Sequence, residues 1–182
     1  DELPEFKRTV LEVMRQPLEE RMVTISRARF SVDFPASLML VAAMNPCPCG
    51  FHNHPSKECQ CPSGTVQKYL NRVSGPLLDR IDIHIEVTPV SFDELSAKPE
   101  SEGSAMIRER VMKARTVQEA RFDYTPQIHC NAQLGSKELK EHCTIDAQGH
   151  EMLKNAMRKL SLSARAYDRI LKVARTIADL DG

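Results

Sequence analysis

A continuous apolar run at residues 37–44, SLMLVAAM, restricts the possible folds of this chain more than any other segment. It is bounded by Pro35 and Pro46, and no polar side chain interrupts it after Ser37. Such a run is typical of a strand that is buried on both faces, as in a parallel sheet. It therefore predicts an α/β fold for this part of the chain.

Two segments before this run show regular periodicity. Residues 5–20 have apolar side chains at helical spacing and predict a helix, which Pro17 should end or kink. Residues 21–36 alternate between apolar and polar side chains and predict a β-hairpin. The tip of this hairpin is expected at Arg27–Phe30.

Two further elements are expected after residue 62. A helix is predicted over residues 63–74, with Ser63 as its N-cap and with Gly75 and Pro76 breaking it. Residues 80–90 place an apolar side chain at every second position and predict another strand. The alternating side chains are Ile81, Ile83, Ile85 and Val87.

The character of the chain changes after residue 90. Residues 91–104 are polar, contain Pro and Gly, and predict a linker. Helices are expected over residues 104–122, 136–143, 147–160 and 163–180. In the last helix, a stripe is expected to be core: Ile170, Leu171, Ala174, Ile177 and Ala178. The fold class is thus α/β plus all-α, with domains at residues 1–98 and 105–182.

Two Cys-x-Cys pairs follow the apolar run directly. They are Cys47/Cys49 and Cys59/Cys61, and the five prolines and glycines around them predict an irregular, turning segment. Closely spaced thiolate pairs suit a structural zinc site, although either His52 or His54 could replace one cysteine. A reduced, metal-free loop and a redox disulfide are the alternatives. Cys130 and Cys143 stand apart, and we expect them on or near a core face.

Composition excludes some functions. The chain has 25 basic and 25 acidic residues, so its overall charge favours no particular partner, and a local basic patch stays open. No apolar run approaches the ~18–20 residues of a membrane span. The chain opens on DELPEF, which is unlike a signal peptide, and we expect a cytoplasmic protein without membrane contact.

Four polar features stand beside the predicted elements. They are Asp1-Glu2 at the chain start, Asn45 after the apolar run, Arg80 between Asp79 and Asp82, and Arg165 near the start of the last helix. Ligands bind at strand exits of parallel sheets, which makes Asn45 a candidate site residue. Each feature alone has a simpler interpretation, namely a turn at Asn45, a local salt bridge at Arg80 and a solvated Arg165.

Taken together and in this order, these features resemble the C-terminal two-thirds of an AAA+ ATPase module of the magnesium-chelatase-like branch. DELPEF resembles the end of the Walker B element, and VLEVMRQPLEE with the hairpin resembles the helix and pre-sensor hairpin of that branch. LVAAMNP resembles sensor 1, GPLLDRID the arginine-finger segment, and SARAYDRILKVARTIADL the sensor 2 helix. The run MNPCPCG is similar to the ComM-like competence proteins.

This resemblance implies a partial AAA+ nucleotide-binding sheet, carrying the hairpin and a cysteine insertion, followed by a helical lid. It implies that Asp1 helps to hold the Mg²⁺ of Mg-ATP and that Glu2 polarises the attacking water. Asn45 would position that water, Arg80 would reach the ATP of a neighbouring subunit, and Arg165 would contact the nucleotide of its own subunit. These residue types suit phosphoryl transfer, which needs metal, an acceptor for the water and fixed cations.

One departure from the family concerns the phosphate-binding loop. No G-x-x-x-x-G-K-[ST] run occurs here, and the resemblance places that loop upstream of Asp1. In the AAA+ sheet, the strand before the loop lies between the sensor 1 and arginine-finger strands, so both predicted strands should expose apolar faces and unpaired edges. We expect the chain alone neither to bind ATP tightly nor to hydrolyse it. The helical part should be better ordered, or the sheet part should pair with another copy.

The resemblance also suggests a substrate. Magnesium-chelatase ATPase subunits have a short link between sensor 1 and the arginine-finger segment, whereas 34 residues separate Asn45 from Arg80. The resemblance to the ComM-like proteins implies a hexameric ring that acts on DNA in branch migration, with the hairpin in the central pore. Arg27 and Arg29 are then candidate DNA contacts, or else a solvated turn. The alternatives are a metal-chelatase motor subunit and a non-catalytic zinc-bearing assembly module.

Overall fold

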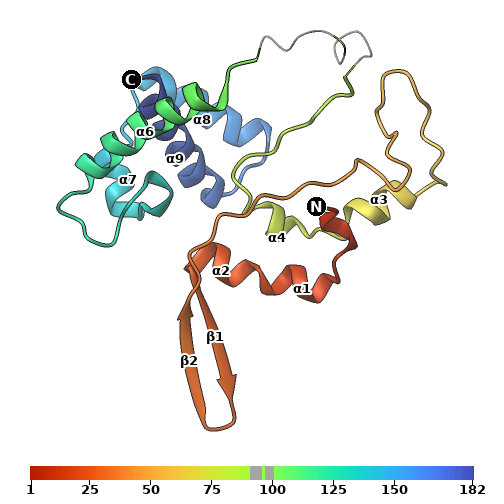
Figure 1. Cartoon of the computed structure of the whole chain (residues 1–182), viewed down its shortest axis with the longest axis horizontal. Helices are drawn as coiled ribbons and strands as arrows, with labels where there is room; N and C mark the ends of the chain where they lie inside the picture. The colour runs from red at the N-terminus through yellow and green to blue at the C-terminus, as the bar shows by residue number, and fades with distance from the viewer. Residues whose placement is uncertain (91–95, 97–100) are drawn as a thin grey trace. The chain divides into compact units, whose positions relative to one another are not determined.

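The computed structural model describes residues 1–90, 96 and 101–182, so most of the predicted linker lies outside the described residues. The chain divides into two units, Asp1–Ser91 and Phe92–Gly182. Figure 1 shows the first unit in red to yellow-green and the second in green to blue. Of the described helices, none combines the length and the hydrophobicity that crossing a membrane requires.

The first unit begins with three short helical elements. They are the 3₁₀ turn η1 (Leu3–Glu5), α1 (Arg8–Val13) and α2 (Arg15–Glu20). The predicted helix is therefore kinked, and the break falls at Met14. Pro17 explains this position, because it has no N–H to donate to the Val13 carbonyl and its ring clashes with that carbonyl.

The predicted hairpin is confirmed. β1 (Met22–Arg27) pairs with β2 (Phe30–Pro35) in antiparallel register, from Met22 opposite Pro35 to Arg27 opposite Phe30. Residues directly opposite each other share a face of the ribbon. One face carries the apolar pairs Val23–Phe34 and Ile25–Val32, while Thr24–Asp33 and Ser26–Ser31 hydrogen bonds occupy the other. The hairpin starts just after α2 and projects away from it (Figure 1).

The two strands predicted at residues 37–44 and 80–90 do not form, and this part of the fold prediction was wrong. Neither segment is paired with a strand. Within the described residues, the only sheet is the two-stranded hairpin. Their apolar side chains are exposed, as Val41 (81%) and Val87 (85%) show. A strand needs a neighbouring strand that supplies a ladder of hydrogen bonds, and among residues 1–90 no strand pairs with either segment. The expectation of exposed apolar faces is confirmed.

The helix predicted at residues 63–74 is shorter than expected. α3 spans Thr65–Leu70, and its N-cap is Gly64 in a left-handed conformation (φ 77°) rather than Ser63. Gly75 and Pro76 do not simply break a helix but start α4 (Gly75–Leu78). Ser74 caps α4, and proline suits the first turn because that N–H has no partner within the helix. A small core joins η1, α1 and α4: Leu3, Leu11, Val73 and Leu77.

The second unit is helical, as predicted. It contains α6 (Ser104–Arg121), η2 (Asn131–Gln133), α7 (Ser136–His142), α8 (Ala147–Lys159) and α9 (Ala164–Asp181). Side chains of Asp146 and Ser163 cap α8 and α9. One core cluster holds the helices together: Phe122, Leu134, Leu139, Cys143, Leu153 and Leu171. Cys143 lies in the core as expected, and Cys130 is half-buried.

The predicted core stripe of α9 is mostly wrong. Leu171 is buried, but Ile170, Ala174, Ile177 and Ala178 are exposed. The buried side of α9 instead carries Ala166, Leu171 and Asp179. The buried face of α9 therefore does not coincide with its apolar stripe. A polar network around Asp179 occupies part of the buried face.

Candidate functional site

The four cysteines of the two Cys-x-Cys pairs converge in the structure. Their sulfur atoms all lie within 4.8 Å of one another. Cys47 Sγ is 3.3 Å from Cys49 Sγ and 3.8 Å from Cys59 Sγ, and Cys49 Sγ is 3.6 Å from Cys59 Sγ. Four sulfurs at ~2.3 Å around a tetrahedral metal ion are about 3.8 Å apart. The sulfur spacing therefore fits a four-coordinate metal ion, and none of these cysteines forms a disulfide.

The backbone of this loop is arranged around the sulfurs. A turn joins the Gly50 N–H to the Cys47 carbonyl at 3.0 Å, and Gly50 takes a positive φ of 82° that disfavours residues with a side chain. Backbone N–H groups of Phe51 and Gln60 donate to the Cys49 sulfur. The Cys61 N–H donates to the Cys59 sulfur, and the Cys49 N–H donates to the Cys61 sulfur. Such donors stabilise thiolates before a metal arrives.

The thiols differ in their acidity. The hydrogen bond from the Phe51 N–H is the largest influence on Cys49 and lowers its pKa to about 6. The Cys49 N–H acts in the same direction on Cys61, but burial and the three neighbouring thiols outweigh it and raise that pKa to about 12. Four adjacent thiolates repel one another unless a cation lies between them. The cluster is therefore suited to a divalent ion.

The two histidines of the loop are not part of this cluster. His54 Nδ1 accepts hydrogen bonds from the Ser56 and Lys57 N–H groups, each at 3.1 Å. Phe51 packs edge-on against the His54 ring, and the Lys57 ammonium lies 4.9 Å from the Phe51 ring centre. His54 thus stabilises the turn between the two cysteine pairs, and among the described residues the candidate metal ligands are the four sulfurs.

The structure joins the start of the chain to the segment that leads to Asn45. The Leu3 N–H donates to the Ala43 carbonyl at 3.1 Å, which brings Glu2 and Asn45 to neighbouring backbone segments. Both residues are exposed, as is Asp1, and Glu2 has a left-handed backbone (φ 54°). The acidic pair and Asn45 therefore lie on backbone segments that are hydrogen-bonded to each other through Leu3 and Ala43.

Tyr69 is a residue of this region that sequence reasoning missed. It is the buried residue of α3, and its hydroxyl accepts a hydrogen bond from the Asn45 N–H. Burial, and next to it the carboxylate of Glu5, raises the pKa of Tyr69. Tyr69 thus connects α3 to the segment that leads into the cysteine loop. The sequence could have indicated this residue, because Tyr69 lies within the helix predicted at residues 63–74.

Arg80 is held by an ion pair across 61 positions of the chain. Its Nε donates to Glu19 Oε2 of α2 at 2.9 Å, its Nη2 contacts the same oxygen, and its Nη1 donates to the Pro76 carbonyl. The Arg80 side chain is only 9% exposed. A salt bridge does form, but its partner in these contacts is Glu19, rather than the adjacent acids that the sequence suggested.

The remaining predicted residues lie elsewhere. Arg27 is the last residue of β1 and faces Phe30 across the hairpin, and Arg29 lies in the tip; all three are exposed. Arg165 is an exposed residue in the first turn of α9, in the second unit. The structure therefore gathers Asp1, Glu2, Asn45 and the cysteines in the first unit and leaves the two hairpin arginines at its tip.

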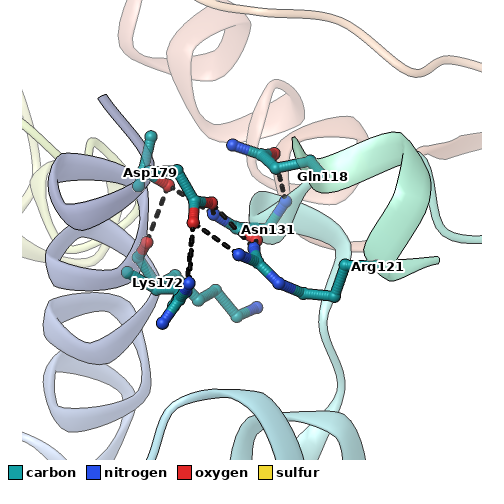
Figure 2. A network of polar contacts seen from close by, with 7 residues as sticks. Gln118, Arg121, Asn131, Lys172 and Asp179 are labelled. Atoms are coloured by element: carbon teal, nitrogen blue, oxygen red, sulfur yellow. Dashed lines mark hydrogen bonds and ion pairs between the residues drawn. The ribbon is translucent and has the colours of Figure 1, made fainter. Parts of the chain in front are cut away.

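A buried polar network in the second unit was also missed (Figure 2). Arg121 forms a two-pronged ion pair with Asp179, whose side chain is 0% exposed. Asn131 Nδ2 donates to Asp179 at 2.8 Å, and Arg175 Nε donates to it at 3.1 Å. Burial alone would raise the pKa of Asp179, but the hydrogen bonds from Arg121 and Asn131 lower it to about 2. The network connects α6, η2 and α9.

Known proteins match both units. Residues 1–95 match the family described as magnesium chelatase, subunit ChlI, and residues 101–182 match its C-terminal domain. The chain is 46% identical over 187 residues to the competence protein ComM of Haemophilus influenzae and 42% identical over 183 residues to the uncharacterized protein YifB of Escherichia coli. Each alignment covers 100% of this chain and 35% of the relative, so the chain spans about a third of the length of these relatives.

Proposed function

Because this chain belongs to the magnesium chelatase ChlI family, we propose that it is part of a longer ATPase that works as a hexameric ring and remodels or translocates DNA. The observation that carries this proposal is the match over the whole chain to a competence protein, since competence concerns the uptake of DNA. The backbone hydrogen bond between Leu3 and Ala43 supports the ATPase assignment, because Leu3 directly follows the acidic pair and Ala43 lies two positions before Asn45.

Within such a ring, each predicted residue has a role in the hydrolysis of Mg-ATP. Asp1 would hold the metal ion, Glu2 would accept a proton from the attacking water, and Asn45 would orient that water. Arg80 would stabilise charge on the nucleotide of the neighbouring subunit, and Arg165 would contact the nucleotide of its own subunit. Bound Mg-ATP supplies the phosphoryl group and the metal charge for this chemistry.

The exposed segments at residues 37–44 and 80–90 favour the proposal that a central strand of the longer protein lies between them. Both are extended, apolar and without strand pairing, although buried apolar strands of this type occur inside parallel sheets. We propose that a strand of the longer protein, leading into its phosphate-binding loop, pairs with both. ATP-binding and the order of these segments would then depend on that upstream part.

The hairpin arginines supply a test of DNA contact. Replacing Arg27 and Arg29 with alanine in the full-length protein should raise the DNA concentration needed for half-maximal stimulation of ATP hydrolysis by on the order of tenfold. Two phosphate contacts per subunit are lost in this variant. Basal hydrolysis without DNA should stay unchanged. Lys137→Ala/Lys140→Ala, which removes two exposed cations from α7, is the matched control. Equal stimulation of both variants would argue against a pore role of the hairpin.

A chelatase motor is the second candidate, because the family takes its description from magnesium chelatase. The two functions differ in what stimulates hydrolysis. A DNA motor should hydrolyse ATP faster with DNA, whereas a chelatase subunit should respond to its porphyrin-binding partner and a porphyrin. ATP hydrolysis by the full-length protein, measured with each addition in turn, decides between them. Stimulation by porphyrin components alone would overturn the DNA proposal.

We further propose that the four-cysteine cluster holds structural zinc. Four thiolates complete the tetrahedral shell and leave no open position for catalysis. Metal analysis of the chain purified under reducing conditions should give about one equivalent of zinc. Cys47→Ser/Cys59→Ser should abolish that binding, whereas Cys130→Ser, outside the cluster, should keep it. Less than about a tenth of an equivalent in the unaltered chain would contradict the assignment.

A further inference from the structure

A basic groove in the first unit has no role in the sites described above. Its volume is about 600 Å³, and it is lined by the segment from the end of η1 to the start of α1 and by α3 with the two residues that follow it. The lining residues are Glu5, Phe6, Lys7, Arg8, Lys68, Asn71 and Arg72. Four of these seven side chains are cationic, whereas acidic and basic residues balance at 25 each over the whole chain.

The cations of the groove are mostly available to a ligand. Arg72 is bound to Glu5 at 2.9 Å and to the Pro4 carbonyl at 3.1 Å, so it is fixed in place and neutralises the one acid of the groove. Lys7 and Lys68 are exposed, and neither forms an ion pair with a residue in the described part of the chain. With four cations against Glu5, the lining of the groove therefore carries a net positive charge.

An aromatic ring lies among these cations. Phe6 is 52% exposed and lines the groove next to Lys7. Exposed phenylalanine is costly in water, and a flat apolar ring within a basic groove suits a ligand with both phosphates and bases. Proteins that bind single strands combine a positive groove along the backbone with aromatic rings on which bases stack. An acidic peptide would use the cations but would leave Phe6 without a partner.

We propose that this groove binds single-stranded DNA, with Lys7 and Lys68 on phosphates and Phe6 stacked on a base. The choice of DNA as the nucleic acid rests on the proposed function. This surface is separate from the hairpin tip, and it would give each subunit a second contact with the strand. Arg72 is held by Glu5 at the border of the groove. The DNA backbone would therefore run along the other side, past Lys7 and Lys68.

Fluorescence anisotropy with a labelled oligo-dT, on the chain of residues 1–182, tests the proposal at several salt concentrations. Lys7→Ala/Lys68→Ala should bind about tenfold or more weakly at 0.1 M salt, and the slope of log affinity against log salt should fall in magnitude by about 1.4. Lys137→Ala/Lys140→Ala carries the same change in charge and should bind as the unaltered chain does. Phe6→Leu should weaken binding about 5- to 100-fold with an unchanged salt slope.

The outcomes separate this proposal from the function of the whole protein. Equal affinity of the groove variant and its control would overturn the groove, as would the absence of oligo-dT binding at low salt. Polyglutamate, which is anionic but has no bases, is the control ligand. If Phe6→Leu weakened its binding as much as that of oligo-dT, the stacking role would be overturned. None of these results bears on the motor proposal, which DNA-stimulated ATP hydrolysis by the full-length protein decides. Circular dichroism confirms that Phe6→Leu and the lysine variants are folded.

Discussion

Replacing Arg80 with alanine in the full-length protein is expected to lower the rate of ATP hydrolysis by about 10³- to 10⁵-fold, or roughly 4–7 kcal/mol in the barrier. An arginine supplied by a neighbouring subunit stabilises charge that develops on the transferred phosphoryl group. In the structure, Glu19 and the Pro76 carbonyl hold the Arg80 guanidinium in one orientation, and the proposed role requires its remaining donors to reach the neighbouring nucleotide. A fixed cation loses little freedom when the transition state forms.

The control and the mixing experiment identify action between subunits. Arg110→Ala removes an exposed arginine that pairs with Glu102 in the second unit, and it should leave hydrolysis unchanged. Arg80→Ala and Glu2→Gln should each be inactive alone. Mixed rings should regain part of the activity, because a Glu2→Gln subunit still offers Arg80 to a neighbour with an intact Glu2. Failure of mixed rings to recover activity would show that Arg80 does not act on the neighbouring subunit.

Asp179→Ala is expected to destabilise the helical unit by about 3–5 kcal/mol, because it leaves the Arg121 guanidinium buried without its counter-ion. Asn131 and Arg175 would lose the same acceptor. Urea unfolding followed by far-ultraviolet circular dichroism measures this change. Asp181→Ala, an exposed acid two residues further along the chain, is the matched control and should alter the free energy of unfolding by less than about 0.5 kcal/mol.

The pH dependence gives this prediction its sign. The folded pKa of Asp179 is about 2, below the ordinary value of 3.8, so its ionisation favours the folded state above the ordinary pKa. That contribution, about 2 kcal/mol, should be lost as the pH falls from about 5 to 2. The difference between the unaltered chain and Asp179→Ala should shrink by this amount over the same range. A difference that is constant with pH would mean that the Asp179 charge contributes nothing.

The helices could be predicted from the sequence and the central strands could not, for a physical reason. α6 to α9 are specified by local spacing and by caps such as Ser163, which act within a few residues. Residues 37–44 and 80–90 have strand patterns, but a strand forms only with a partner that supplies hydrogen bonds. The apolar pattern of both segments could be recognised locally, whereas strand pairing depends on a partner segment that a local pattern does not specify.

The same distinction applies to the candidate site. The four cysteines lie within residues 47–61, so their spacing sufficed to predict that they converge. Glu19 and Arg80 are 61 positions apart, and Arg121 and Asp179 are 58 apart. No local pattern reports such pairs, and they became visible only with the fold.

The close spacing of the cysteines also affects the order in which the chain folds. Closing a short loop costs less conformational entropy than joining distant segments, and contacts of low sequence separation form early. If the cluster binds zinc as proposed, it could do so during synthesis, before the segments that follow it have left the ribosome. The loop would then be a preformed unit to which the later segments add, and its assembly would respond to metal supply rather than to nucleotide.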